Sequence, residues 1–472
     1  MRFSKVRAAT GVLACVALAS TLAACGGSGP DAKASRSPSP SPSSASSSPS
    51  AGEPVTLTFG VYGGSRVVGA YSAVAKEYRT IDPSVTVKVE SWPSESAMVD
   101  SLAHGAKAPD VFLTPRADVA ALTDVDVIRP VDTFLEARNV DLGDGYSRVA
   151  ISDFSEDHHL TCMPYSVSPE VLYVNTDLVD FAAMKARGLP VPANPANGKW
   201  SLEQFTAALQ FASKPRRGIA GAYVAPTLRG LSPWLAAAGG QLVDDVRTPT
   251  TTTFSDSLDA LKALQPVLAN PRFRLTSKQL SKATPLQWFE RGRLAVLPGD
   301  RSLVPQLRER AGLHWDVMAM PTNGGGAATT GDYSGLCLSK VTEDADAAAD
   351  FLTYLISTDA VTDVAQSGYV VPVNQQVALA DGFKQPGRAP ANAAVFTDAV
   401  KGMAILPAAR TLAELQDATA TPVRRLFVRG TDAEVLANRI DELSSALLGP
   451  APSTSPSDGA SGGAAASGSP TP

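Results

Sequence analysis

Charged side chains stand where two predicted strands end, and their chemistry suits the binding of a polar solute. Asp300 and Arg301 follow a strand that ends near Gly299, and Arg116 follows a strand at 109–113. A guanidinium fork can hold hydroxyl or carboxylate oxygens, and a carboxylate accepts hydrogen bonds from hydroxyls. The alternatives are solvated surface arginines, or a simple ion pair between Asp300 and Arg301.

Two aromatic residues could give the same site an apolar face. Tyr165 follows a proline in the stretch HLTCMPYSVSPEVLYVNTDL (159–178), which has two strand-like parts separated by Ser168-Pro169. Trp234 precedes small residues that end in two glycines. A tyrosine or tryptophan ring can pack on the C–H groups of a sugar. Tyr165 could instead pack at a hinge, and Trp234 could instead belong to the core.

Further candidates lie at strand ends and in a loop. Gly64 and Ser65 end the first predicted strand, and Thr114 ends the third. Ligands of parallel sheets bind beyond the carboxyl ends of the strands. The backbone N–H groups near Gly64 could therefore face a ligand, although a plain turn is the alternative. Asp332, just before a strand at 336–338, could accept hydrogen bonds from sugar hydroxyls.

Motifs for metal binding or covalent catalysis are not found. The chain has four histidines, and His158-His159 lacks the spacing of a zinc-binding helix. The glycine-rich stretch after Asn323 lacks the lysine of a phosphate-binding loop. There is no Gly-x-Ser-x-Gly motif. We therefore expect no metal, no cofactor and no catalytic residue, although catalytic groups could still come together from distant positions.

Length and composition predict an α/β protein of two lobes. The 472 residues exceed what one core usually serves. Strands at 55–61, 85–89 and 109–113 alternate with helices at 67–78 and 94–104, which predicts a parallel sheet. The net charge of −5, without a run of Lys and Arg interleaved with aromatics, gives no basis for nucleic-acid binding.

The two ends of the chain are not expected to join this fold. Residues 1–24 have a basic start and a short apolar stretch, as a signal peptide does. Leu22-Ala23-Ala24-Cys25 resembles the bacterial lipobox, which implies that Cys25 is lipidated; a cleaved signal with an incidental cysteine is the alternative. Residues 25–53 are a Ser/Pro-rich linker and 449–472 a disordered tail.

Two cysteines remain for the folded part, Cys162 and Cys337, in apolar strand-like runs. Outside the cytoplasm such a pair favours a disulfide. Two buried free thiols are the alternative.

The order of several soft motifs resembles that of family 1 extracellular solute-binding proteins, the maltose-binding-protein-like receptors of ABC importers. The matching stretches are APDVFL (108–113), MPYSVSPEVLYVNTDLV (163–179), LSPWLAAAGG (231–240) and GYVVP (368–372). The resemblance implies a type II, two-lobed periplasmic-binding-protein-like fold with a hinge of about three crossovers. It also places Tyr369 in the cleft between the lobes. The family usually has Gly-x-Trp where this chain has Gly299-Asp300-Arg301, so stacking of a sugar on tryptophan is not carried over.

This resemblance implies lobe one at 54–163 and 311–355, and lobe two at 168–310 and 356–448. The expected function is capture of a small solute, a carbohydrate, by closure of the lobes and its delivery to ABC permease subunits. We expect a monomer anchored by lipid at the outer face of the cytoplasmic membrane. A sensor or interaction lipoprotein without transport is one alternative, and an extracytoplasmic hydrolase is another.

Overall fold

The computed structural model describes residues 54–143, 145–323 and 329–449. These belong to the second of the two units into which the chain divides, which begins at Gly52. The predicted signal peptide, the lipidation site at Cys25, the linker and the tail from residue 450 lie outside the described residues.

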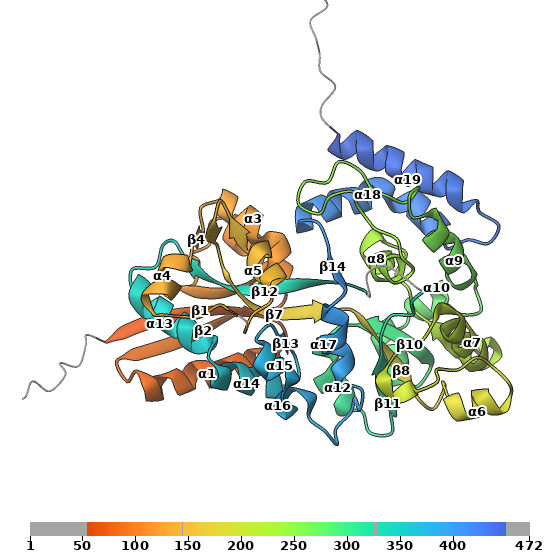
Figure 1. Cartoon of the computed structure of the whole chain (residues 1–472), viewed down its shortest axis with the longest axis horizontal. Coiled ribbons are helices and arrows are strands. Elements are labelled where there is room, and N and C mark those ends of the chain that lie inside the picture. Colours follow the sequence, from red (N-terminus) through yellow and green to blue (C-terminus); the bar gives the residue numbers. More distant parts are fainter. Residues whose placement is uncertain (1–53, 144, 324–328, 450–472) are drawn as a thin grey trace, which may run out of the picture. The chain divides into compact units, whose positions relative to one another are not determined.

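Two sheets organise the described residues (Figure 1). In the larger sheet, β1 pairs in parallel with β2 and β3, as the alternation of strands and helices predicted. The connecting helices also form, with Tyr71 and Tyr78 on the buried face of the first. The elements are β1 (Val55–Tyr62), α1 (Ser65–Ile81), β2 (Val85–Trp92), α2 (Glu95–Ala103), β3 (Val111–Pro115) and α3 (Arg116–Asp124).

An antiparallel ladder, which the sequence did not predict, completes the larger sheet. The long strand β12 (Thr329–Ser339) pairs antiparallel with β3 on one side and with β7 (Met163–Pro169) on the other. β13 (Val371–Pro372) continues the sheet beyond β7. The short strands β4 (Ile128–Arg129) and β14 (Met403–Ile405) also pair with β12. The sheet is therefore mixed.

The smaller sheet has the order β11-β8-β10-β9. Glu170 alone separates the end of β7 from the start of β8, so the chain passes from one sheet to the other within one residue. It passes back between β11 and β12, and after β14 it leaves the larger sheet for α18 and α19, which contact α8 and α9. The strands are β8 (Val171–Asn175), β9 (Ala220–Ala222), β10 (Leu294–Gly299) and β11 (Trp315–Met318).

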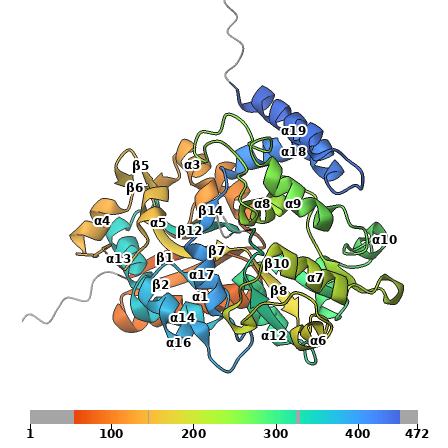
Figure 2. The ribbon, with the colours of Figure 1, turned by 45° about the vertical axis from the view of Figure 1, so that its right-hand side comes forward.

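Helices pack on both sheets. Helices α13 and α14 pack with α1 beside the larger sheet, whereas α18 and α19 pack together and contact α8 and α9 (Figure 2). The longer of these remaining helices are α7 (Leu202–Ala212), α8 (Leu228–Ala237), α9 (Leu258–Leu268), α13 (Ala345–Leu355), α14 (Thr358–Gln366), α18 (Ala409–Arg425) and α19 (Ala433–Leu448).

The shorter elements lie mainly in the connections. They are α4 (Asp132–Ala137), α5 (Arg148–Asp153), β5 (Ser155–Glu156), β6 (His159–Leu160), α6 (Phe181–Ala186), η1 (Pro195–Asn197), η2 (Pro215–Arg217), α10 (Ser277–Leu280), α11 (Pro285–Glu290), η3 (Arg301–Leu303), α12 (Val304–Arg308), α15 (Gln375–Leu379), α16 (Asp381–Lys384) and α17 (Ala394–Val400).

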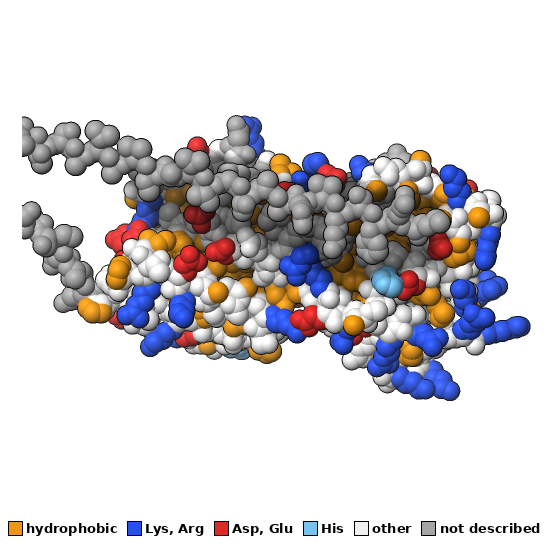
Figure 3. All heavy atoms as spheres, turned by 90° about the horizontal axis from the view of Figure 1, so that it is seen from below, with side chains coloured by type: hydrophobic (Ala, Val, Ile, Leu, Met, Phe, Trp, Pro, Cys, Tyr) orange, Lys and Arg blue, Asp and Glu red, His pale blue; other side chains and the backbone are white. Residues whose placement is uncertain are grey.

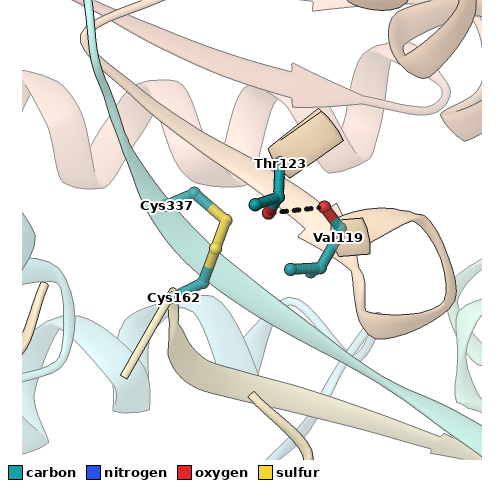
Figure 4. Close-up of a disulfide and its surroundings, with 4 residues drawn as sticks. All are labelled: Val119, Thr123, Cys162 and Cys337. Carbon is teal, nitrogen blue, oxygen red and sulfur yellow. Dashed lines mark hydrogen bonds between the residues drawn. A yellow bond between two sulfur atoms is a disulfide. The ribbon is translucent and has the colours of Figure 1, made fainter. Parts of the chain in front are cut away.

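A disulfide joins Cys162, just before β7, to Cys337 in β12 (Figure 4). Both residues are fully buried. The bond links positions 175 residues apart in the sequence, and it lies between neighbouring strands of the larger sheet.

The lobe boundaries stay a prediction, and the strand pairings lead us to propose two changes. β11 pairs with β8 in the smaller sheet, although residues 311–355 were assigned to lobe one. β13 pairs with β7 in the larger sheet, and α14 packs against α1, although residues 356–448 were assigned to lobe two. We therefore propose that lobe two extends through Met318, and that β13 and α14 belong to lobe one.

Among residues 54–143, 145–323 and 329–449, no helix combines the length and apolar character needed to cross a membrane. In the same residues, no three His, Cys, Asp or Glu side chains gather in a way that could hold a metal ion.

Candidate functional site

A cavity of about 460 Å³ lies where the chain passes from the larger sheet to the smaller one. Its walls come from strand ends of the larger sheet and from segments beside the smaller sheet. This volume falls within the range of small-molecule sites. The lining residues are Tyr62, Gly63, Val67, Tyr71, Glu95, Leu113, Pro115, Ser166, Ser168, Glu170, Arg229, Asp300, Ser302, Thr330, Gly331, Asp332, Ser334, Tyr369, Val370 and Leu406.

The secondary structure explains why polar groups meet here. β1 and β3 are parallel, so their carboxyl ends lie at one edge of the larger sheet and present Tyr62 and Pro115. Glu170 is held at the junction of the sheets, where its backbone N–H donates to the carbonyl of Thr330 over 3.0 Å. Asp300 follows β10 of the smaller sheet. Both sheets therefore contribute to one site.

Two carboxyl groups in the wall are poised to carry a proton near neutral pH. Burial raises the pKa of Glu170 to about 7, and the nearby charge of Asp300 adds to this. Burial likewise raises the pKa of Glu95 to about 7, with a further contribution from Asp118. Each group can therefore donate or accept a hydrogen bond at physiological pH.

The carboxylate of Asp332 is engaged by protein groups. It accepts a hydrogen bond from Arg116 Nε at 2.9 Å and from the backbone N–H of Ala117 at 3.3 Å. Arg116 also donates to the carbonyl of Leu406. The structure thus places Arg116 behind the cavity wall, where it positions Asp332 and ties α3 to β12.

Hydroxyl groups line the cavity beside the carboxyl groups. The hydroxyl of Tyr62 lies 3.3 Å from Ser334 Oγ. The ring of Tyr71, also in the wall, packs against the ring of Tyr165 with centroids 6.2 Å apart. The wall therefore offers aromatic surface as well as hydrogen-bonding groups, although no tryptophan is among its residues.

Three of the residues predicted for the site lie in the cavity wall: Asp300, Asp332 and Tyr369. Gly64 and Ser65 lie directly after the lining residue Gly63, and Ser65 begins α1. Thr114 lies between two lining residues, but its side chain is fully buried and its hydroxyl has no partner among the described residues.

Two predicted aromatic residues lie in the core instead. Trp234 is fully buried on α8, where its ring packs 5.3 Å from that of Phe205. Tyr165 is buried behind Tyr71. Both aromatic rings belong to the apolar core, because their positions in the strand and in the helix turn them away from the cavity.

Arg301 also points away from the cavity. It is 1% exposed, and its guanidinium carbon lies 3.9 Å from the ring centroid of Phe383. Its Nη2 donates to the Phe383 carbonyl at 2.6 Å. Burial lowers its pKa to about 10. The guanidinium therefore stabilises packing beneath η3, in contrast to the prediction of a ligand contact.

Several wall residues were missed by the sequence reasoning. Glu170 stands between the two strand-like parts of the stretch 159–178, so its position could have marked it. Glu95 begins a predicted helix, and Arg229 lies in an uncharacterised stretch before Trp234, so neither carried a signal. These three residues meet because α2 and α8 pack around the strand ends. The segments that carry them lie far apart in the sequence, so no local pattern brings them together.

Comparison with known sequences identifies one protein family. A sequence profile of the family described as bacterial extracellular solute-binding protein matches residues 73–394. No curated protein matches the sequence.

Several of the similar solved structures carry ligand names, including the following three. An ABC substrate-binding protein from Listeria monocytogenes in complex with cycloalternan has a TM-score of 0.69 at 18% identity, and the match covers 83% of this chain and 98% of that one. The GacH receptor of Streptomyces glaucescens, solved unliganded and with acarbose, has a TM-score of 0.67 at 19% identity, covering 83% and 98%. A solute-binding protein from Thermotoga lettingae bound with α-D-tagatose has a TM-score of 0.65 at 17% identity, covering 84% and 100%. At these identities the likeness shows a shared fold.

Proposed function

Because this chain belongs to the family of bacterial extracellular solute-binding proteins, we propose that it captures a small carbohydrate in the cavity and delivers it to an ABC import permease. The protein would act as a monomer at the outer face of the cytoplasmic membrane, held there by lipid on Cys25. The carbohydrates named for the three structural neighbours support this choice of solute.

The observation that carries the proposal is the mixture of groups in the cavity wall. A sugar hydroxyl both donates and accepts hydrogen bonds. Glu95 and Glu170, with a pKa of about 7, can satisfy either role. Tyr62 and Tyr71 add ring surface for the C–H groups of a sugar. Ser166 and the other lining serines add small hydroxyls.

Closure of the lobes would be the binding mechanism. Tyr62 belongs to the larger sheet, and Asp300 follows a strand of the smaller one, yet both line the same cavity. A solute that contacts both sides stabilises the closed arrangement by its differential affinity for that state. The single-residue junction at Glu170 would be one of the hinges.

A thermal-shift screen of sugars, amino acids, polyamines and phosphates tests the proposal. We expect stabilisation by a sugar or a small set of sugars. Glu170→Gln should weaken the binding of that sugar, because the variant keeps the size of the side chain but cannot form the charge-assisted hydrogen bonds of a carboxylate. Glu77→Gln, an exposed residue on α1, is the matched control and should bind as the parent does. A response confined to amino acids or polyamines would contradict the proposal.

One observation favours a second candidate, an extracytoplasmic hydrolase. Two carboxyl groups with a raised pKa in one cavity are what general acid–base chemistry requires. Any sugar that binds should therefore be incubated with the protein and recovered for mass analysis. We expect the sugar to be recovered intact; its cleavage, abolished by Glu170→Gln, would favour the hydrolase.

The genes beside this one distinguish transport from sensing. Adjacent permease reading frames would support delivery to an importer. A neighbouring membrane kinase without permease genes would support a sensor or interaction lipoprotein instead.

A further inference from the structure

A second cavity, of about 420 Å³, lies at the opposite end of β10 from Asp300. Arg293 directly precedes β10 and lines this second cavity, whereas Asp300 directly follows the strand and lines the first. At about 3.3 Å per residue, the two ends are roughly 20 Å apart. The second cavity is therefore separate from the proposed solute site.

Four arginines and no carboxylate line the second cavity. They come from three separate segments of the chain, which is why no basic cluster was apparent in the sequence. The lining residues are Pro215, Arg217, Gly218, Ile219, Ala220, Pro271, Arg272, Arg274, Thr276, Gln279, Trp288 and Arg293.

The sequence around Arg217, Arg272 and Arg274 supplies no negative charge to balance these three. Residues 204–243 and 260–289 contain no Asp or Glu, although the whole chain has a net charge of −5. None of the four arginines forms an ion pair with any residue that the structure describes. Figure 3 shows Lys and Arg side chains gathered at the right-hand end of the face in view, the end at which Figure 1 places α7 and α10.

Two hydrogen bonds join the segments that form the wall of the second cavity. Arg293 Nη1 donates to the carbonyl of Arg217 over 2.9 Å. Gln279 Nε2 donates to the carbonyl of Gly218 over 3.3 Å and closes the rim. The Nε of Arg274 is buried without a hydrogen-bond partner among the described residues, and burial lowers the pKa of this guanidinium. An anion in this cavity would supply hydrogen-bond acceptors and negative charge to the guanidinium groups that line it.

We infer that this cavity binds a phosphate group. The guanidinium fork matches phosphate oxygens in a bidentate manner, and the absence of lining carboxylates leaves the charge uncompensated. Two sources share this chemistry: a free phosphate or phosphate ester, and the headgroup of an anionic phospholipid. The inference does not depend on the solute that the first cavity takes.

The test compares the full chain with a variant that lacks two exposed arginines, Arg217→Ala with Arg272→Ala. Lys76→Ala with Arg79→Ala on α1 removes the same charge from exposed positions in the other part of the fold and serves as the control. Isothermal titration with inorganic phosphate and with pyrophosphate is one arm. Flotation with vesicles of phosphatidylglycerol, against vesicles of phosphatidylcholine, is the other.

Saturable binding in either arm that is at least about tenfold weaker in the arginine variant, and unchanged in the control, supports the inference. The arm that responds identifies the source. Binding should also weaken as sodium chloride is raised, because the arginines are partly exposed. Failure of the parent to bind in both arms would overturn the inference, as would equal binding by the arginine variant. Unchanged melting curves for both variants would verify that they fold.

Discussion

At the scale of single residues, the buried carboxyl groups of the first cavity link stability to pH. Glu170 has a pKa raised from 4.5 to about 7 in the folded protein, mainly by burial. Between these values the folded state binds more protons than the unfolded state. The contribution of this group to stability is therefore present below pH 4.5 and is lost as pH rises through about 7.

Glu170→Gln should remove the part of the pH dependence of stability that comes from this carboxyl group. Without solute, we expect the variant to be more stable than the parent at pH 8 by about 1–3 kcal/mol, and nearly equal to it at pH 4.5. Urea unfolding at the two pH values measures the difference. A variant less stable than the parent at pH 8 would show that the carboxylate has a favourable partner when charged.

Trp234 should matter for stability rather than for binding. Its side chain is fully buried and packs against Phe205. Trp234→Ala should lower the free energy of unfolding by about 3–5 kcal/mol. The milder Trp234→Phe should leave the affinity for the solute unchanged in calorimetry. A large loss of affinity in a well-folded Trp234→Phe protein would restore the predicted role in the site.

The candidate residues show what the sequence can and cannot reveal at this scale. Asp300 and Asp332 were found because each stands next to a predicted strand, and strand ends form sites in such sheets. Arg301 was predicted on the same grounds. It lies one residue after Asp300, yet its side chain turns into the core and packs against the ring of Phe383. Sequence position thus locates a strand end but does not give the direction of each side chain.

At the scale of elements, the disulfide crosslinks the centre of the larger sheet. It joins residues 175 apart, which greatly restricts the unfolded chain. Cys162→Ser with Cys337→Ser should lower the free energy of unfolding by about 3–5 kcal/mol. The affinity for the solute should persist, since neither cysteine lines the cavity. Unfolding at the same urea concentration in the parent and the variant would contradict this role.

The first turn of α7 offers a second test. Ser201 Oγ accepts from the backbone N–H of Gln204 at 3.2 Å, and Gln204 Oε1 accepts from the backbone N–H of Ser201 at 2.9 Å. Ser201→Ala removes one of these two bonds and should cost about 1 kcal/mol in urea unfolding. Ser277→Ala, an exposed residue of α10 whose hydroxyl forms no hydrogen bond with the described residues, is a suitable comparison and should change the midpoint less.

Local elements were largely predictable, whereas their long-range pairing was not. The parallel strands β1, β2 and β3 follow from alternation of strands and helices along the chain. The pairing of β12 with both β3 and β7 joins segments more than a hundred residues apart. Nothing in local periodicity specifies such partners, so the mixed character of the sheet emerged only from the structure.

At the scale of the whole molecule, the proposed capture of a solute depends on closure of the two lobes. We expect the radius of gyration from small-angle X-ray scattering to fall when a solute saturates the protein. Glu170→Gln at the same solute concentration should show a smaller change, because fewer molecules are bound. A saturated protein with unchanged scattering would mean that binding occurs without closure.

The central claim is that the cavity at the junction of the sheets captures a carbohydrate without altering it. The most direct test is isothermal titration of the parent, Glu170→Gln and the control Glu77→Gln with the sugar found in the screen, followed by mass analysis of the recovered sugar. We expect one-site binding by the parent and the control, binding about tenfold weaker by Glu170→Gln, and intact sugar. Equal affinity in all three proteins, or cleaved sugar, would contradict it.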